Sequence, residues 1–182
     1  MLTERAILYQ QDAESLRALQ TQTLMKVRTI VAVDPDVTKS GVAIIDVENK
    51  TVIAEAKTFP DLIDYFQGIS DKDSVRIAVE AGWLIKTNWH RAPSMAAAAS
   101  VGNRTGRNHE TGRKIVEMCE HIGLSVSLIK PLGKRWKGAN GKITHCELES
   151  VLNGLKIALN KKRTNQDERD SILIAIHEYE RL

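Results

Sequence analysis

The sequence contains little cysteine, which limits the chemistry open to it. Its 182 residues include two cysteines, Cys119 and Cys146, which lie far apart and form no C-x-x-C pair. A zinc site built on paired cysteines is therefore not expected. Reduced thiols, as in a cytoplasmic protein, are the default interpretation.

Long apolar runs are also missing. The longest, ILIAI at residues 172–176, is far too short to span a bilayer. The opening stretch MLTERAILYQ carries a charge early and has no apolar signal core. MAAAAS, at residues 95–100, is the one segment of low complexity, and we find no internal repeat. A globular protein is expected.

An excess of charge of one sign is absent as well. The net charge is +3 and the pI is near 8.9, which permits nucleic-acid binding without requiring it. With 42% hydrophobic residues, the length fits one domain with a sizeable core. Residues 3–25 lack glycine and proline and predict a polar helix. We therefore expect a helical extension over residues 1–26 and a single domain over residues 27–182.

The sequence predicts an α/β domain with a mixed sheet. Runs rich in β-branched residues predict an antiparallel three-stranded meander over 27–33, 40–47 and 51–59. The elements expected next are a helix at 61–69, a strand at 74–80, a helix at 94–121 and a strand at 124–131. Thr144 and Glu147 have the spacing of a capping box, so a helix should begin there, and a last helix should begin near Gln166.

Four acidic residues stand at the ends of these predicted elements. Asp34 ends the first strand and Glu80 ends the fourth, while Asp167 and Asp170 open the last helix at i,i+3 spacing, on one helix face. If the first and fourth strands are neighbours, all four acids can meet at one sheet edge. Clustered carboxylates need a counter-charge, and hard cations such as Mg²⁺ or Mn²⁺ prefer oxygen ligands. Two such ions could clamp the attacking water and the leaving oxygen of a phosphodiester.

Each acid also has a simpler interpretation. Asp34 could initiate the turn that follows it, since Asp-Pro is typical of turns. Glu80 could be a solvated strand end. Asp167 could favour a helix N-terminus through the macrodipole, and Glu168 and Asp170 could be exposed helix charges. The joint pattern, rather than any one residue, favours a metal site.

Basic residues crowd the loop before the predicted helix at Thr144. Those that we expect to bind DNA phosphates are Lys130, Lys134, Arg135, Lys137 and Lys142. The alternative is a solvated loop. Arg104 and Arg107 of the long helical region are further candidates for DNA binding.

Trp83 lies in the strand-exit segment just after Glu80. Such a ring could stack on an unpaired base of DNA. The alternative is a core position, where tryptophan is more often found.

Four motifs stand out in the sequence: VDPDVTKSGVAIID (33–46), VEAGW (79–83), SVGNRTGRNHETGRKI (100–115) and NQDERDSILIAIH (165–177). They resemble the motifs of the RuvC-type Holliday junction resolvases of the ribonuclease H-like superfamily. The resemblance covers roughly residues 27–180. Asp36 departs from it, because the family usually has glycine there. The segment after Trp83 is longer than usual, and the N-terminal helix is an addition.

The resemblance implies a ribonuclease H-like fold and a specific activity. Two Mg²⁺ ions, which Mn²⁺ could replace, would be held by Asp34, Glu80, Asp167 and Asp170, with Asp34 bridging both. A homodimer would nick two opposed strands of a four-way DNA junction and leave 5′-phosphate ends, in DNA recombination and repair. The implied location is the cytoplasm, at the nucleoid or in the host of a phage, with an organelle as the alternative.

Other functions remain open at this point. The same fold could serve a nuclease for flaps or other branched DNA, or a non-catalytic DNA-binding protein. Kinase-like ATP-binding domains also open with an aspartate between two strands, but they need two lobes, which one short chain does not supply. Cleavage assays on a junction, a flap and a linear duplex would separate these possibilities.

Overall fold

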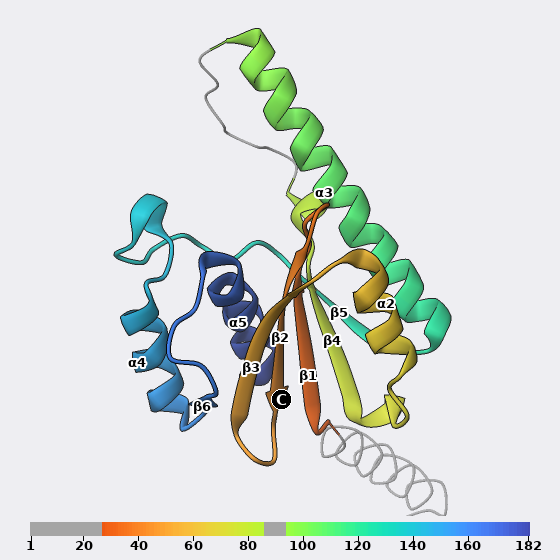
Figure 1. Cartoon of the computed structure of the whole chain (residues 1–182), viewed down its shortest axis with the longest axis vertical. Coiled ribbons are helices and arrows are strands. Elements are labelled where there is room, and N and C mark those ends of the chain that lie inside the picture. Colours follow the sequence, from red (N-terminus) through yellow and green to blue (C-terminus); the bar gives the residue numbers. More distant parts are fainter. Residues whose placement is uncertain (1–26, 86–93) are drawn as a thin grey trace, which may run out of the picture.

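The computed structural model describes residues 27–85 and 94–182. Six strands form one mixed sheet in the order β5-β4-β1-β2-β3-β6, with helices on both faces (Figure 1). This confirms the predicted α/β class with a mixed sheet. The predicted N-terminal helix falls in residues 1–26, outside the described residues.

The first three strands form the predicted antiparallel meander. They are β1 (Thr29–Asp34), β2 (Ser40–Asp46) and β3 (Thr51–Lys57). The third strand ends two residues earlier than predicted, because Thr58 instead caps the following helix by accepting a hydrogen bond from the backbone of Asp61.

The other three strands run parallel to their neighbours. β4 (Val75–Glu80) pairs with β1, and β5 (Ser125–Ile129) pairs with β4. The short β6 (Ala158–Leu159) pairs with β3 and was not predicted, since two residues give no periodic signal. The pairing of β1 with β4 fulfils the condition under which Asp34 and Glu80 emerge at one edge.

In the described part of the chain, helices cover both faces of the sheet. α2 (Phe59–Gln67) and α3 (Met95–Ile122) lie on one face, while α5 (Gln166–Tyr179) lies on the other with α4 (His145–Leu155) beyond it (Figure 1). The N-terminal half of α3 projects past the sheet. Short 3-10 turns occupy Lys72–Ser74, Gly82–Leu84 and Ala139–Gly141. Within the described ranges, every helix is too short or too polar to cross a membrane.

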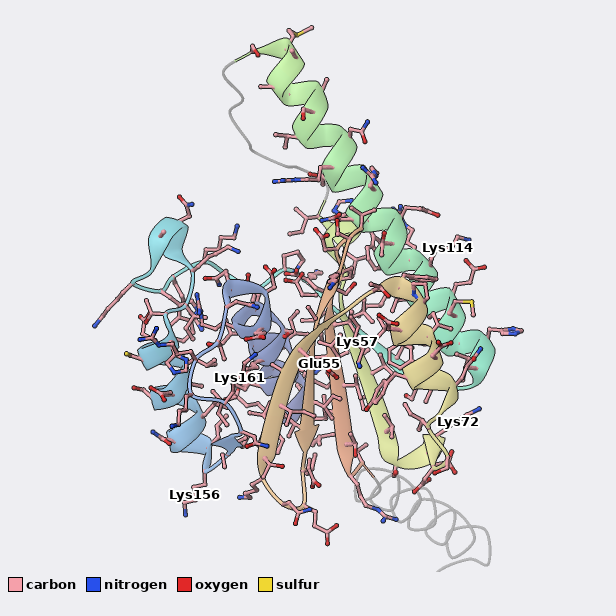
Figure 2. All side chains as sticks on the ribbon, in the orientation of Figure 1. Glu55, Lys57, Lys72, Lys114, Lys156 and Lys161 are labelled. Carbon is pink, nitrogen blue, oxygen red and sulfur yellow. The ribbon has the colours of Figure 1, made fainter. Side chains whose placement is uncertain are left out.

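The helix ends follow local chemistry that is visible in the sequence. The capping box of Thr144 and Glu147 is present, as predicted. α3 stops at Gly123, whose φ of 87° lies in the left-handed region that glycine tolerates. Lys72 donates to the carbonyl of Ile122 at 2.7 Å and so satisfies the end of this helix (Figure 2).

Alternate residues of the central strands pack into two separate hydrophobic cores, one on each face of the sheet. Ile30 and Ala32 of β1 pack under α5, whereas Val31 and Val33 pack under α2 and α3. All four are fully buried. Because both faces are covered, β1 is held rigidly, and its terminal Asp34 is fixed in position at the sheet edge.

Candidate metal centre

Asp34 and Glu80 meet at the ends of neighbouring strands. β1 and β4 are parallel and in register, so both carboxyl ends reach the same sheet edge. The two side chains lie close enough for each to affect the acidity of the other, and both are half-buried.

Burial and nearby negative charge shift the acidity of this pair. Burial is the largest cause of the shift at Asp34, followed by the negative charges of Glu80, Asp170 and Asp167, and together they raise the pKa of Asp34 to about 8. The pKa of Glu80 is also raised, chiefly by burial. The pair therefore cannot be fully ionised at neutral pH without a cation.

The basic loop reaches the Glu80 carboxylate. The backbone N–H of Leu132 donates a hydrogen bond to Glu80, and the positive charge of Lys134 lies close enough to favour its ionised form. Both act against the burial that raises the pKa of Glu80. Glu80 is thus contacted by the basic loop, which we predict from the sequence to bind phosphates.

A glycine allows the start of α5 to approach the same edge. Gly41 of β2 pairs with Asp34 in the sheet. A Cβ at Gly41 would lie 2.6 Å from the backbone carbonyl oxygen of Asp167, so glycine is required for this approach. The helix that carries Asp167 and Asp170 therefore begins directly against the strand beside Asp34.

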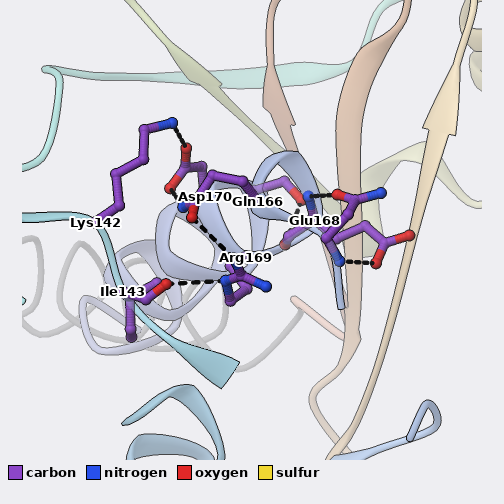
Figure 3. Close-up of polar contacts among 8 residues, drawn as sticks. Lys142, Ile143, Gln166, Glu168, Arg169 and Asp170 are labelled. Carbon is purple, nitrogen blue, oxygen red and sulfur yellow. Dashed lines mark hydrogen bonds and ion pairs between the residues drawn. The ribbon is translucent and has the colours of Figure 1, made fainter. Parts of the chain in front are cut away.

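Asp170 already has two partners. Lys142 Nζ lies 2.9 Å from Asp170 Oδ2, and Gln166 Nε2 donates to Asp170 Oδ1 at 2.7 Å (Figure 3). The side chains of Lys142 and Asp170 are 34% and 26% exposed, so this ion pair is partly shielded from solvent. Lys142, predicted to bind DNA, thus lies inside the acidic site.

The structure places three of the four predicted ligands in one pocket and the fourth outside it. Asp34, Glu80 and Asp170 line one pocket, whereas Asp167 is exposed and lies outside its lining. Across residues 27–85 and 94–182, no three acidic, histidine or cysteine side chains stand close enough to hold an ion in this arrangement. The ligand set stays a prediction.

The chemistry of these side chains fits a hard divalent cation. The donors are carboxylate oxygens, and the central pair is desolvated and short of positive charge. Coordination by Asp170 would require its carboxylate to exchange Lys142 for the cation. Asp34 and Glu80 would form the fixed part of such a site, because both belong to the sheet.

The pocket beside the acids has a volume of about 410 Å³. Besides the three acids, it is lined by apolar rings and side chains, by the helix residues Thr105, Asn108 and His109, and by two cations. The apolar and cationic members include Trp83, Ile85, Leu132, Trp136, Lys134 and Lys142. The pocket thus combines anionic, cationic and aromatic groups within one hollow.

Trp83 packs against α3. A Cβ at Gly112 would lie 2.5 Å from the indole, so this glycine makes room for the ring. The ring meets His109 edge-on at 6.4 Å between centroids, and the guanidinium of Arg113 lies 5.6 Å from its centroid. Trp83 is half-buried and also faces the pocket. Its stacking on DNA stays a prediction.

The remaining predicted DNA-binding residues are mostly exposed. Those on the surface are Lys130, Lys134, Arg135, Lys137, Arg104 and Arg107. The loop that carries the first four folds back on itself, because Trp136 and Gly138 donate backbone hydrogen bonds to the carbonyls of Gly141 and Lys142. Their cationic groups are thus presented on a folded loop.

Asp36, the departure from the family pattern, has a structural role. It accepts hydrogen bonds from the backbone of Thr38 at 2.8 Å and from Asn108 Nδ2 at 3.0 Å. Asn108 Oδ1 in turn accepts from the backbone of Val37. These contacts fasten the β1–β2 turn to α3. Asn108 was not predicted, because no local pattern reveals a contact across seventy residues of chain.

The interpretation of Glu168 as an exposed helix charge is wrong. Glu168 is 5% exposed and forms a capping box with Asn165. Lys161 Nζ lies 2.5 Å from its carboxylate (Figure 2). The Asn-x-x-Glu spacing was available in the sequence as a signal for this cap. Glu168 therefore fixes the start of α5 next to the site.

Solved structures of resolvases resemble this chain. Thermus thermophilus RuvC in complex with a Holliday junction substrate is 14% identical, with 83% of this chain and 92% of that chain covered and a TM-score of 0.48. A second Thermus thermophilus RuvC structure is 17% identical, with 83% of this chain and 93% of that chain covered and a TM-score of 0.45. The yeast mitochondrial Holliday junction resolvase Ydc2 is 12% identical, with 82% of this chain and 78% of that chain covered and a TM-score of 0.36.

No family model matches the chain, and no curated protein does. The solved structures belong to the group that the sequence motifs resemble.

Proposed function

We propose that this protein is a metal-dependent endonuclease that resolves four-way DNA junctions by paired symmetric nicks. The observation that carries the proposal is the desolvated Asp34–Glu80 pair in a pocket that also contains Lys134 and Lys142. The paired carboxylates call for a cation, and the two lysines in the same pocket suit the binding of a phosphodiester. This combination is typical of metal-assisted phosphoryl chemistry.

Four acids would hold Mg²⁺, with Mn²⁺ as a substitute: Asp34, Glu80, Asp167 and Asp170. Two ions would fit the number of carboxylates, with Asp34 shared between them. Bound there, the ions would supply Lewis-acid stabilisation of the charge that develops on the phosphodiester. Hydrolysis would leave 5′-phosphate and 3′-hydroxyl ends.

Basic side chains would place the DNA backbone over the acids. Lys142 would bind the scissile phosphate once a cation takes its place at Asp170, because it lies within the pocket. Lys134 would bind an adjacent phosphate, with Lys130, Arg135 and Lys137 on the same loop. Arg104 and Arg107 on the projecting part of α3 would contact a second arm of the junction.

A homodimer would explain paired nicks, and α3 offers a surface for it. Ala96, Ala98, Ala99 and Gly102 are exposed on the projecting half of this helix, so they do not pack against the protein's own sheet. Small residues permit close approach of two helices, and a two-fold dimer matches the symmetry of a junction. Sedimentation should show a species of twice the 20.3 kDa monomer mass.

Incubation with three synthetic substrates tests the proposal. A four-way junction, a flap and a linear duplex would each be incubated with the protein in Mg²⁺ or in EDTA. We expect symmetric cleavage of the junction in Mg²⁺ and none in EDTA. Preferential cleavage of the flap would assign a different branched substrate. Junction binding without any cleavage in Mg²⁺ would indicate a non-catalytic DNA-binding protein.

A further inference from the structure

Arg169 connects three separate segments beside the acidic site. Its Nε donates to the carbonyl of Ile143 at 2.9 Å, one terminal nitrogen donates to the carbonyl of Thr164, and the other donates to Gln166 Oε1 at 2.9 Å (Figure 3). The planar guanidinium presents its donors in a fixed fork, so these acceptors are held in one geometry. Ile143 directly follows Lys142, which ends the basic loop.

This arrangement dictates the orientation of the Gln166 amide. Arginine can only donate hydrogen bonds, so the amide oxygen of Gln166 has to face Arg169. The amide nitrogen then faces Asp170 and donates to its Oδ1 at 2.7 Å. Reversing the amide would break both contacts. The hydrogen-bonded chain from Arg169 through Gln166 to Asp170 therefore has one satisfied state.

Asp170 is consequently held from both sides. Gln166 binds one carboxylate oxygen and Lys142 binds the other. The two partners differ in kind, because Lys142 is a charge that a cation can replace, whereas Gln166 is neutral and leaves a lone pair of Oδ1 free. Exchange of Lys142 for a metal ion thus leaves the carboxylate anchored through Gln166.

We propose that Gln166 and Arg169 are positioning residues for the predicted metal ligand Asp170, and that Arg169 couples this ligand to the basic loop through Ile143. The inference rests on the proposed function. Groups that orient a metal ligand through hydrogen bonds contribute strongly to metal affinity, and their loss typically costs about 10- to 100-fold. A merely structural role for Gln166 would affect folding and not metal affinity.

Mn²⁺ titration of the full chain, followed by electron paramagnetic resonance, tests this inference. Gln166→Met keeps the length of the side chain and removes both polar contacts. We expect its Mn²⁺ dissociation constant to rise about 10-fold. Affinity for a four-way junction in EDTA should be unchanged, because the basic loop is intact. The matched control is Gln67→Met, an exposed residue at the end of α2, which should bind Mn²⁺ as wild type does.

Two further variants test the positioning role independently of Gln166→Met. Gln166→Asn is one methylene shorter and cannot reach Arg169 and Asp170 together, so it should also weaken Mn²⁺ binding if Gln166→Met fails to fold. Arg169→Lys keeps the charge but loses the fork, and it should weaken Mn²⁺ binding in the same direction.

The possible outcomes separate the inference from the proposed function. Wild-type Mn²⁺ affinity in folded Gln166→Met or Gln166→Asn, with or without a lower melting temperature in EDTA, would overturn the positioning role alone. Absence of Mn²⁺ binding by the wild-type protein would overturn the proposed function and the inference with it.

Discussion

The acidic site has a strand half, Asp34 and Glu80, and a helix half, Asp167 and Asp170, and the two halves balance their charge differently. In the strand half, burial and nearby negative charge raise the pKa of the two carboxyl groups. In the helix half, Asp167 faces solvent and Asp170 is paired with Lys142. The strand half therefore carries the unfavourable charge that a cation would relieve.

The difference has a physical origin in the elements that carry the acids. The two strands that end at Asp34 and Glu80 are paired in register and buried on both faces, so the sheet itself brings these two acids together. A helix start is bordered by loops, whose cations can exchange. The rigid half sets the position of the site, and the helix half supplies partners that respond to a ligand.

The largest expected effect comes from removing charge in the strand half. Asp34→Asn keeps the shape but removes the shared carboxylate, and a metal site contributes several kcal/mol to such chemistry, so junction cleavage should fall at least about 100-fold. Binding to the junction should survive, because the basic loop is untouched. Gel-based cleavage and binding assays in Mg²⁺ measure both.

Substitution of the other acids tests the same difference between the strand half and the helix half. Glu80→Gln and Asp170→Asn should also abolish cleavage, while Asp167→Asn should be the mildest, since Asp167 lies outside the pocket lining. Asp36→Asn is the control and should retain most activity, because Asp36 is occupied with Thr38 and Asn108. Equal losses for Asp36 and Asp34 would contradict the assignment of the strand half.

The basic loop should affect binding more than chemistry. Replacing Lys134, Arg135 and Lys137 together by alanine should reduce the slope of log affinity against log salt by about 2.7, since about three counterions are no longer released. Filter binding across a salt series measures this slope. Lys114→Ala should leave it unchanged, because Lys114 is already paired with Glu117 at 2.7 Å (Figure 2). An unaltered slope in the triple variant would refute phosphate binding by this loop.

The strand half should also make metal-free stability depend on pH. The pKa of Asp34 is about 8 in the folded protein and about 4 in the unfolded chain. Its protonated form therefore stabilises the fold fully below pH ~4, and this contribution is lost as the pH rises through about 8, by up to about 1.4 kcal/mol per pH unit.

Urea unfolding of wild type and Asp34→Asn in EDTA, from pH 5 to pH 9, isolates this contribution. The stability of wild type should fall relative to that of the variant as the pH rises. Parallel curves would show that Asp34 is not desolvated.

A smaller effect is expected where the two halves meet. Gly41→Ala places a Cβ 2.6 Å from the carbonyl of Asp167, so α5 has to shift, at a cost of about 1–3 kcal/mol. Gly154→Ala, in the last turn of α4 with open space around it, should be neutral or stabilising by up to about 1 kcal/mol. Urea unfolding compares the two. Similar behaviour of both variants would argue against the close approach.

Much of the frame of the site could be predicted from the sequence. β-branched runs located the strands that end at Asp34 and Glu80, and the capping box at Thr144 located the start of α4. These signals are local, because strand periodicity and capping depend on residues a few positions apart. The predicted helix start near Gln166 likewise placed Asp167 and Asp170 in the first turns of α5.

The contacts that connect the site could not be predicted. Arg169 joins Ile143 to Thr164, and Gly41 admits the backbone of Asp167, across long separations in sequence. No local pattern encodes which loop meets a helix start. The role of Glu168 is an exception, because Asn165 and Glu168 have the spacing of a capping box and this local signal predicts that Glu168 caps the helix.

The central claim is that Asp34 and Glu80 need a cation, and thermal unfolding at pH 8 with and without Mg²⁺ tests it most directly. Wild type should be stabilised by Mg²⁺, by about 2.7 kcal/mol at 100 times the dissociation constant. Asp34→Asn should start more stable in EDTA and gain little from Mg²⁺. Equal stabilisation of both proteins, or of neither, would contradict a metal site at the end of β1.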